Sequence, residues 1–285
     1  MKYRLTLIVV CLLASGCGRI EGIGYHPPVA AVDWCADQPC LEVMGIVLSQ
    51  PTSSLLVFVL ALFSIFVGWR FLRTLQGQKA RFWWGISLLL GGIGALVAGI
   101  SYQAFGFEIK CAGLEYCTWT SWWEIAYELL TVMSSSALLL AVAHSCFPSK
   151  WIKISSVVAM LNIPMYIVVL GAGLMSSDRV MLSFEMMLLF TAPFYVAILV
   201  LNIIQQLRKP TEILKSYIWS WIILFSTLAA YFSYMMLGFT QDLWRNGIWF
   251  SDNDVLHVGM ILWIFHIWKL ILPLVKDGNE AGEAI

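Results

Sequence analysis

The chain is poor in charged residues. Asp, Glu, Lys and Arg make up 12 % of its 285 residues, against about 25 % in ordinary soluble domains, and acids and bases balance to a net charge of zero. A net charge of zero argues against nucleic acid as a partner, and we expect none. The sequence also contains no serine-nucleophile motif, P-loop or redox motif, and no internal repeat of the kind that builds symmetric transporters.

Apolar residues dominate instead, at 60 % of the chain, and the mean hydropathy is +0.81. Seven apolar segments are each long enough to cross a bilayer as a helix. A helix suits this role because it satisfies the hydrogen bonds of its own backbone within the segment, where lipid offers none. The sequence therefore predicts an all-α, polytopic membrane protein, a bundle of seven transmembrane helices. The segments are Ser54–Leu75, Phe82–Phe105, Trp122–Cys146, Ile152–Met175, Val180–Leu207, Tyr217–Phe239 and Val255–Val275.

The first residues read as a targeting signal. Lys2 and Arg4 precede the apolar run Leu5–Leu13, which is too short to span a membrane, and small residues follow. Residues 1–16 are therefore interpreted as a signal peptide. The stretch 13–17 resembles a bacterial lipoprotein signal, which would place lipid on Cys17; an ordinary cleaved signal is the alternative. Residues 17–52 would form a short periplasmic segment, 53–276 the bundle and 277–285 a cytoplasmic tail.

The Lys and Arg residues gather on one side of the predicted spans, and by the positive-inside rule that side is cytoplasmic. We therefore expect an outside N-terminus, a cytoplasmic C-terminus and a multi-pass protein of the bacterial inner membrane. The cysteines agree, because an oxidising exterior favours disulfides. Cys35 and Cys40 precede the first span, and Cys111 and Cys117 lie in the next outer loop. Pairing within each loop is expected, and pairing between the loops is the alternative.

Polar residues cluster toward the outer ends of four spans. Glu124 and Glu128 are four apart and share one helix face. We expect Glu128 to face the bundle interior, because lipid penalises a carboxylate, whereas Glu124 fits the headgroup region. The topology places further polar side chains at the same depth. They are Ser101, Tyr102 and Gln103 in the second span, Glu185 in the fifth, and Asn253, Asp254 and His257 at the start of the seventh.

This layer admits three interpretations. Carboxylates and imidazole suit a divalent metal such as zinc, with Glu128 and His257 as ligands, or a general acid and base. An acid beside a histidine also forms a proton relay or a pH switch. The third interpretation is a buried hydrogen-bond network that fixes helix packing. The second span also carries Gly91, Ala95 and Gly99, a stripe of small residues that lets a neighbouring helix approach closely.

Seven helices, acids on the third span and the stretch 253–257 on the seventh are similar to the CREST superfamily of membrane hydrolases. That superfamily includes alkaline ceramidases and progestin/adiponectin-type receptors, and uncharacterised bacterial seven-helix proteins lie near it. The resemblance implies a zinc site built from Ser-x-x-x-His and His-x-x-x-His motifs with an Asp. Ser101 and His257 match these motifs, but Phe105 and Ile261 stand where the other two histidines belong.

Two functions follow from this sequence. The first is an intramembrane metal-dependent hydrolase of a lipid amide or ester, with its site in the outer half of the bilayer. In it, Glu128 and His257 hold metal or move protons, and Asp254 orients His257. The second is a non-catalytic seven-helix sensor or receptor that binds a small or lipid ligand in the same pocket. In both cases membrane lipid is the expected partner.

Overall fold

The computed structural model describes residues 20–278, and seven of its helices are long and apolar enough to cross a membrane. The expected signal peptide and Cys17 lie outside the described residues. The long helices are α2 (Pro51–Arg73), α3 (Lys79–Ala98, continued by the π-helical turn η3, Gly99–Ala104), α5 (Trp122–Cys146), α6 (Ser149–Ser176), α7 (Phe184–Arg208), α8 (Glu212–Met236) and α10 (Asp252–His266, continued by η4, Ile267–Ile271). The structure is predominantly helical, and its seven long apolar helices suggest a multi-pass membrane protein, as the apolar segments predict.

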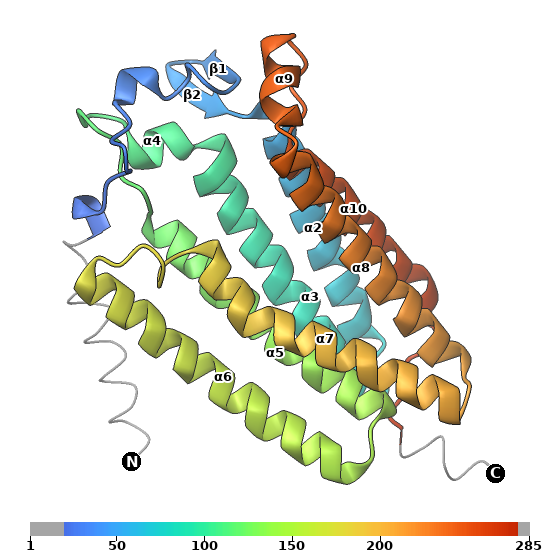
Figure 1. Cartoon of the computed structure of the whole chain (residues 1–285). Helices are drawn as coiled ribbons and strands as arrows, with labels where there is room; N and C mark the ends of the chain where they lie inside the picture. The colour runs from blue at the N-terminus through green and yellow to red at the C-terminus, as the bar shows by residue number, and fades with distance from the viewer. Residues whose placement is uncertain (1–19, 279–285) are drawn as a thin grey trace.

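A small extension covers one end of the bundle, called the cap end below (Figure 1). It is built from residues 20–50 and 105–121. The first part contains the short helices η1 (Ile20–Gly22) and η2 (Ala31–Asp33) and the antiparallel hairpin of β1 (Cys40–Val43) and β2 (Ile46–Ser49); the second contains α4 (Gly106–Lys110). The hairpin reverses at Met44 and Gly45, which both have positive φ, as a tight two-residue turn requires. A further short helix, α9 (Phe239–Arg245), projects from the same end.

Both pairs of cap cysteines form disulfides within their own segments, as expected. Cys35 bonds to Cys40, and Cys111 bonds to Cys117, each with an S–S distance of 2.05 Å. The two segments are joined to each other by backbone hydrogen bonds, among them Cys117 N–H to Val29 O at 2.9 Å. The first segment is therefore held over the bundle by the second without a disulfide between them.

The long helices form a ring. Helix α2 packs against α3, α3 against α5, α5 against α7, α7 against α8, and α8 against α10, which returns to α2. Helix α6 lies outside the ring and packs mainly on α5, at the edge of the bundle in Figure 1. Helices α2 and α3 approach each other closely, because a Cβ added to Gly92 would lie 2.9 Å from the backbone oxygen of Ala61.

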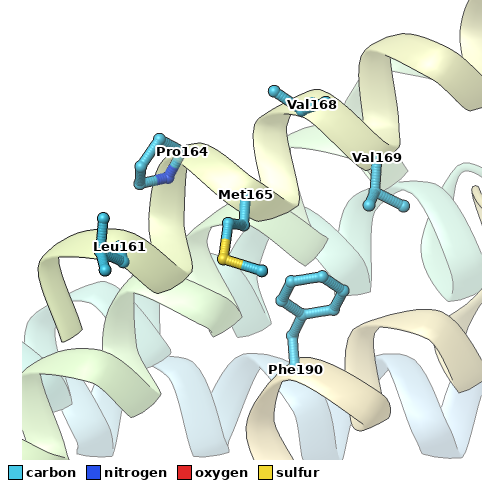
Figure 2. Close-up of a pocket in the computed structure, with 6 residues that line it drawn as sticks. All are labelled: Leu161, Pro164, Met165, Val168, Val169 and Phe190. Atoms are coloured by element: carbon cyan, nitrogen blue, oxygen red, sulfur yellow. The ribbon is translucent and has the colours of Figure 1, made fainter. Parts of the chain in front are cut away.

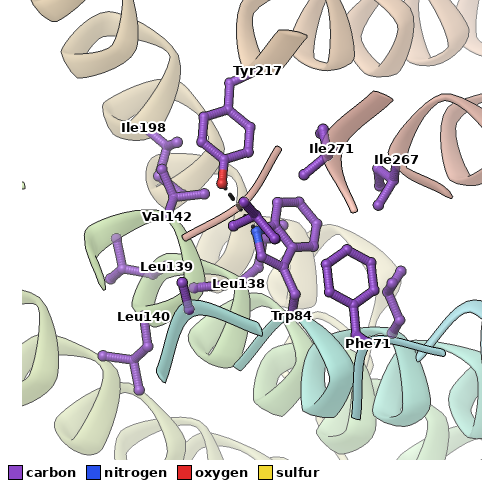
Figure 3. Close-up of a cluster of buried hydrophobic side chains, with 14 of the residues drawn as sticks. Phe71, Trp84, Leu138, Leu139, Leu140, Val142, Ile198, Tyr217, Ile267 and Ile271 are labelled. Atoms are coloured by element: carbon purple, nitrogen blue, oxygen red, sulfur yellow. Dashed lines mark hydrogen bonds between the residues drawn. The ribbon is translucent and has the colours of Figure 1, made fainter. Parts of the chain in front are cut away.

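The main core lies toward the end of the bundle opposite the cap, and Figure 3 shows some of its side chains. Trp84 of α3 stacks between Phe71 of α2 and Tyr217 of α8, and its indole N–H donates to the Tyr217 hydroxyl at 3.2 Å. Tyr217 in turn donates to Ser145 of α5 at 2.9 Å. These side chains thus join the four helices α2, α3, α5 and α8. They fix the geometry of the ring of helices whose other end carries the cap.

Candidate functional site

The cap end contains a buried ion pair. The Lys110 ammonium at the end of α4 lies 2.9 Å from the Glu124 carboxylate in the first turn of α5, and the two side chains are only 4 % and 2 % exposed. Glu124 therefore does not sit exposed among headgroups as the sequence favoured. Its helix is capped by Ser121, whose hydroxyl accepts from the Glu124 N–H, so the backbone holds the carboxylate toward α4.

Three aromatic rings enclose the Lys110 ammonium. It lies 5.7 Å from the ring centre of Tyr25 and 5.5 Å from those of Trp34 and Tyr102, and it donates to the Tyr25 hydroxyl at 3.1 Å. Such rings attract a cation through their negative faces. Burial opposes the charge and would lower the pKa of Lys110, but the Glu124 carboxylate and Tyr25 outweigh it, so this pKa is raised. The charged lysine fastens residues 20–50 to α5.

Glu128 lies one turn further along α5 and is 1 % exposed, so it faces the interior as predicted. Its Oε2 accepts from the Tyr166 hydroxyl of α6 at 2.8 Å, whereas its Oε1 is buried and has no protein donor among the described residues. The two acids on this face therefore differ. The charge of Glu124 is balanced by a lysine. Glu128 accepts one hydrogen bond from a neutral hydroxyl, and its other oxygen has no donor among the described residues.

A pocket opens between α6 and α7 (Figure 2). It has a volume of about 400 Å³ and an apolar lining of Leu161, Pro164, Met165, Val168, Val169 and Phe190. Phe190 packs against the buried Tyr166 ring with 5.0 Å between ring centres. The wall of the pocket thus contacts the residue that donates to Glu128, which connects an apolar surface hollow to an interior carboxyl group.

Asp254 and His257 belong to a different part of the cap end, where α10 meets α2. Asp254 accepts from the Ser53 hydroxyl at 3.0 Å and from the backbone N–H and hydroxyl of Ser251, which completes a capping box at the start of α10. His257 is 6 % exposed, and its Nδ1 has no hydrogen-bond partner within residues 20–278. The expected orientation of His257 by Asp254 is therefore absent from the described contacts.

No hydrogen bond or ion pair in the described part of the chain joins Glu128 to Asp254 or His257. Glu128 contacts α6, whereas Asp254 contacts α2 and its own capping residue. The hypothesis that the three act as one catalytic group stays a prediction without a shared contact. Asp254, by contrast, has an evident structural role, because its two carboxylate oxygens are engaged by the Ser53 and Ser251 pair.

The remaining predicted pocket residues divide into four groups. Tyr102 is one of the three aromatic rings around the Lys110 ammonium, and it packs edge-on against Tyr127 with 5.8 Å between ring centres. Ser101 and Gln103 are buried in η3 with side-chain oxygens that lack a protein partner among residues 20–278. Asn253 makes a long contact of 3.5 Å to Gln50. Glu185 departs from expectation: α7 begins at Phe184, not at residue 180, so Glu185 lies in the first helical turn and is exposed.

The donor set does not fit the zinc ion considered from the sequence. Within residues 20–278, no three His, Cys, Asp or Glu side chains come close enough to one another to hold a metal ion. Zinc sites use three or four such ligands, and here Glu124 is engaged by Lys110 and Asp254 by serines. No reaction step is therefore derived through a metal.

Comparison of the chain with family models, with curated proteins and with solved structures finds no match. The similarity to the CREST superfamily stays a prediction.

The sequence reasoning missed Lys110, Tyr166 and Phe190. Lys110 had a signal, because it is the one Lys or Arg in residues 105–121 and stands fourteen positions before an acid that needs a partner. Tyr166 and Phe190 had none that a single sequence reveals, since an aromatic residue in an apolar helix reads equally well as lipid contact or core.

Proposed function

We propose that this protein is a non-catalytic membrane sensor that binds the acyl chain of a lipid in the pocket between α6 and α7. The observation that carries the proposal is the contact of the pocket wall with the interior carboxyl group, through Phe190, Tyr166 and Glu128. A bound chain presses on Phe190, and Phe190 sets the position of the hydroxyl that Glu128 accepts from. Glu128 has a second, unpartnered oxygen, so it can change partners when Tyr166 shifts.

The position of the pocket along α6 supports an acyl chain as the occupant. Residues 161–169 lie in the middle of α6, a helix of 28 residues, so they fall within the hydrocarbon core when α6 spans a bilayer. The lining is apolar, and the pocket volume is within the range of about 300–1,000 Å³ that ligand sites occupy. A polar ligand would lose its hydration there without gaining hydrogen bonds, whereas an acyl chain loses nothing.

The proposal includes the orientation of the bundle, with the cap outside and the C-terminus in the cytoplasm. Both disulfides lie in the cap, whereas the free Cys146 lies at the opposite end, which matches an oxidising and a reducing side. The Lys and Arg asymmetry of the loops gives the same orientation. A periplasm-active reporter fused after Ile285 is expected to be inactive, and activity there would reverse the orientation.

The test uses the purified full chain in phosphatidylcholine nanodiscs that contain a lipid with a photoreactive group on its acyl chain. We expect crosslinks that map to residues 161–169 and to Phe190. Val168→Trp should fill the pocket and suppress these crosslinks. Val157→Trp is the matched control, because Val157 is exposed on the same helix but does not line the pocket. Equal labelling of the two variants would show that lipid merely coats the helices.

The same experiment separates a sensor from a hydrolase. The bound lipid is expected to be recovered intact, and its binding is expected to raise the melting temperature of the chain, as any ligand selective for the folded state does. Cleavage of the probe lipid by the wild-type protein, abolished in Glu128→Gln, would contradict the sensor and restore the hydrolase.

A further inference from the structure

The β1–β2 hairpin displays an apolar face to its surroundings. Side chains alternate between the two faces of a strand, and the pairs Leu41–Leu48 and Val43–Ile46 therefore lie on the same face. Leu41, Val43 and Ile46 are exposed, and Met44 at the turn is 99 % exposed. Leu41, Val43, Met44, Ile46 and Leu48 are called the hairpin platform below. The hairpin that carries them lies at the cap end, beyond the spanning helices (Figure 1).

One edge of the hairpin is covered and the other is free. Strand β2 packs on α4 and η3, and its Val47 N–H donates to the Glu108 carboxylate at 3.0 Å. Strand β1 has β2 as its sole strand neighbour in the described residues, and three of its four residues are exposed. In an antiparallel pair, alternate residues direct their N–H and C=O groups away from the partner strand, so β1 offers an edge to which another strand can add.

The exposed charge of the two cap segments is of one sign, and the exposed Arg245 of the neighbouring α9 is paired with Asp242 at 3.6 Å. Residues 20–50 contain no Lys or Arg, and the single Lys in residues 105–121, Lys110, is buried against Glu124. The exposed charged groups of these two segments are acids, namely Asp33, Asp37, Glu42 and Glu115. Two copies of the cap would repel each other, and an anionic bilayer surface would repel the cap as well. A basic partner would be attracted.

We propose that the hairpin platform is a docking site for an extended segment of another protein, apolar on one face and rich in Lys or Arg, that adds to the free edge of β1. Main-chain hydrogen bonds along β1 hold the segment, its apolar side chains continue the platform, and its basic side chains meet the acids of the cap. The disulfide of Cys40 to Cys35 fixes the start of β1, so the edge is ordered before the partner arrives. This docking site is independent of the acyl-chain pocket.

The probe is a short fluorescent peptide of alternating lysine and valine residues, titrated against the full chain in phosphatidylcholine nanodiscs. We expect saturable binding that weakens with added salt, and no binding of the matched glutamate–valine peptide. Leu41→Ser combined with Val43→Ser should weaken binding by about tenfold or more, since two aliphatic side chains lose their buried contact. Val32→Ser is the control, because Val32 is 90 % exposed in the cap but lies off the hairpin.

Glu42→Gln tests the charge without touching the apolar face and should weaken the binding of the lysine peptide while leaving the platform intact. Four results would overturn the proposal. They are no binding to the wild-type chain, equal binding of the acidic peptide, dimerisation of the chain that is lost in the Leu41 and Val43 double variant, and a blue shift of Met44→Trp fluorescence caused by the nanodisc lipid alone. The last two would assign the platform to a second copy or to the membrane.

Discussion

Helices α2, α3 and α5 differ from helices α6 and α7 in how they meet their neighbours. In the first set, glycines bring backbones into direct contact: Gly68 of α2 faces Gly85 of α3, and Gly92 faces the backbone of Ala61 and Ile65. Between α6 and α7 there is instead an apolar pocket beside Phe190. Close backbone packing has one solution and resists displacement, whereas an interface spaced by flexible side chains can adjust. The first set is called the fixed sector and the second the adjustable sector below.

The two acids of α5, Glu124 and Glu128, also differ in which sector holds them. Glu124 belongs to the fixed sector, because it pairs with Lys110, whose ammonium is itself enclosed by three aromatic rings. Glu128, one turn away, depends on Tyr166 of the adjustable sector. In the proposed sensor, a shift of α6 acts on Glu128 through Tyr166, whereas the ion-pair partner of Glu124 is Lys110 of α4. This arrangement suits a sensor whose extramembrane cap stays in place while a ligand acts within the bundle.

Lys110→Met is expected to cause the largest loss of stability. It removes the partner of a buried carboxylate, and breaking such a pair costs about 3–5 kcal/mol of unfolding free energy, because Glu124 is left charged and unpaired. Denaturant unfolding in detergent micelles measures the loss. Lys215→Met serves as the control, since Lys215 is exposed on α8.

The double variant Lys110→Met with Glu124→Gln should recover part of this loss, because the uncompensated charge is gone. If the two single changes instead add in full, the buried pair is not formed in the folded protein. That result would also mean that Lys110, through Tyr25 and Trp34, does not hold residues 20–50 to the fixed sector.

Gly92→Ala should cost about 1–3 kcal/mol, the usual range for overpacking, because the added Cβ would meet backbone atoms of α2 at 2.9 Å. Gly94→Ala is the matched control on the same helix. Its Cβ would lie 3.5 Å from Leu130, an ordinary contact, so only the better helix propensity of alanine remains. The difference in melting temperature between the two variants measures the closeness of α2 and α3. Equal melting temperatures would mean that these helices are no more fixed than α6 and α7.

The helices of the fold could be predicted from the sequence, because helices long enough to span a membrane need long apolar runs. Such runs are visible in the linear sequence without knowledge of which residues meet in space. The third span, Trp122–Cys146, was predicted with the bounds of α5. The fifth was placed four residues too early, since Val180 to Ser183 are apolar or small but are used as a loop with Ser183 as the helix cap. That shift made Glu185 look interior when it is exposed.

The candidate site was only partly readable, because it depends on which helix faces meet. The interior position of Glu128 followed from its spacing to Glu124, but its partner on α6 did not, since no local pattern links residues 128 and 166. The small-residue stripe shows the same limit. The predicted stripe grouped Gly91, Ala95 and Gly99 at four-residue spacing, yet Gly91 faces Ser134 of α5. The glycines that face α2 are Gly85, Gly92 and Gly99, which are seven apart.

The smallest expected effect lies in the adjustable sector. Tyr166→Phe removes the donor to Glu128 and leaves the ring against Phe190 in place. Hydrogen bonds between membrane helices are worth about 0.6 kcal/mol on average, and a bond to a carboxyl group somewhat more, so we expect a loss of about 1 kcal/mol in unfolding free energy.

Tyr217→Phe is the matched comparison, because it deletes the same atom from a buried hydroxyl that bonds to Ser145 and Trp84 in the main core. The two variants should melt at similar temperatures but differ in their response to lipid. With the acyl-chain lipid bound, Tyr217→Phe should keep the rise in melting temperature of the wild type, since the pocket is unchanged. Tyr166→Phe should also bind the lipid, as seen by crosslinking, but the rise should be altered, because the path from Phe190 to Glu128 is cut. An unaltered rise in Tyr166→Phe would show that the pocket and the carboxyl group are neighbours without being coupled, and the adjustable sector would then be a lipid contact and not a sensor.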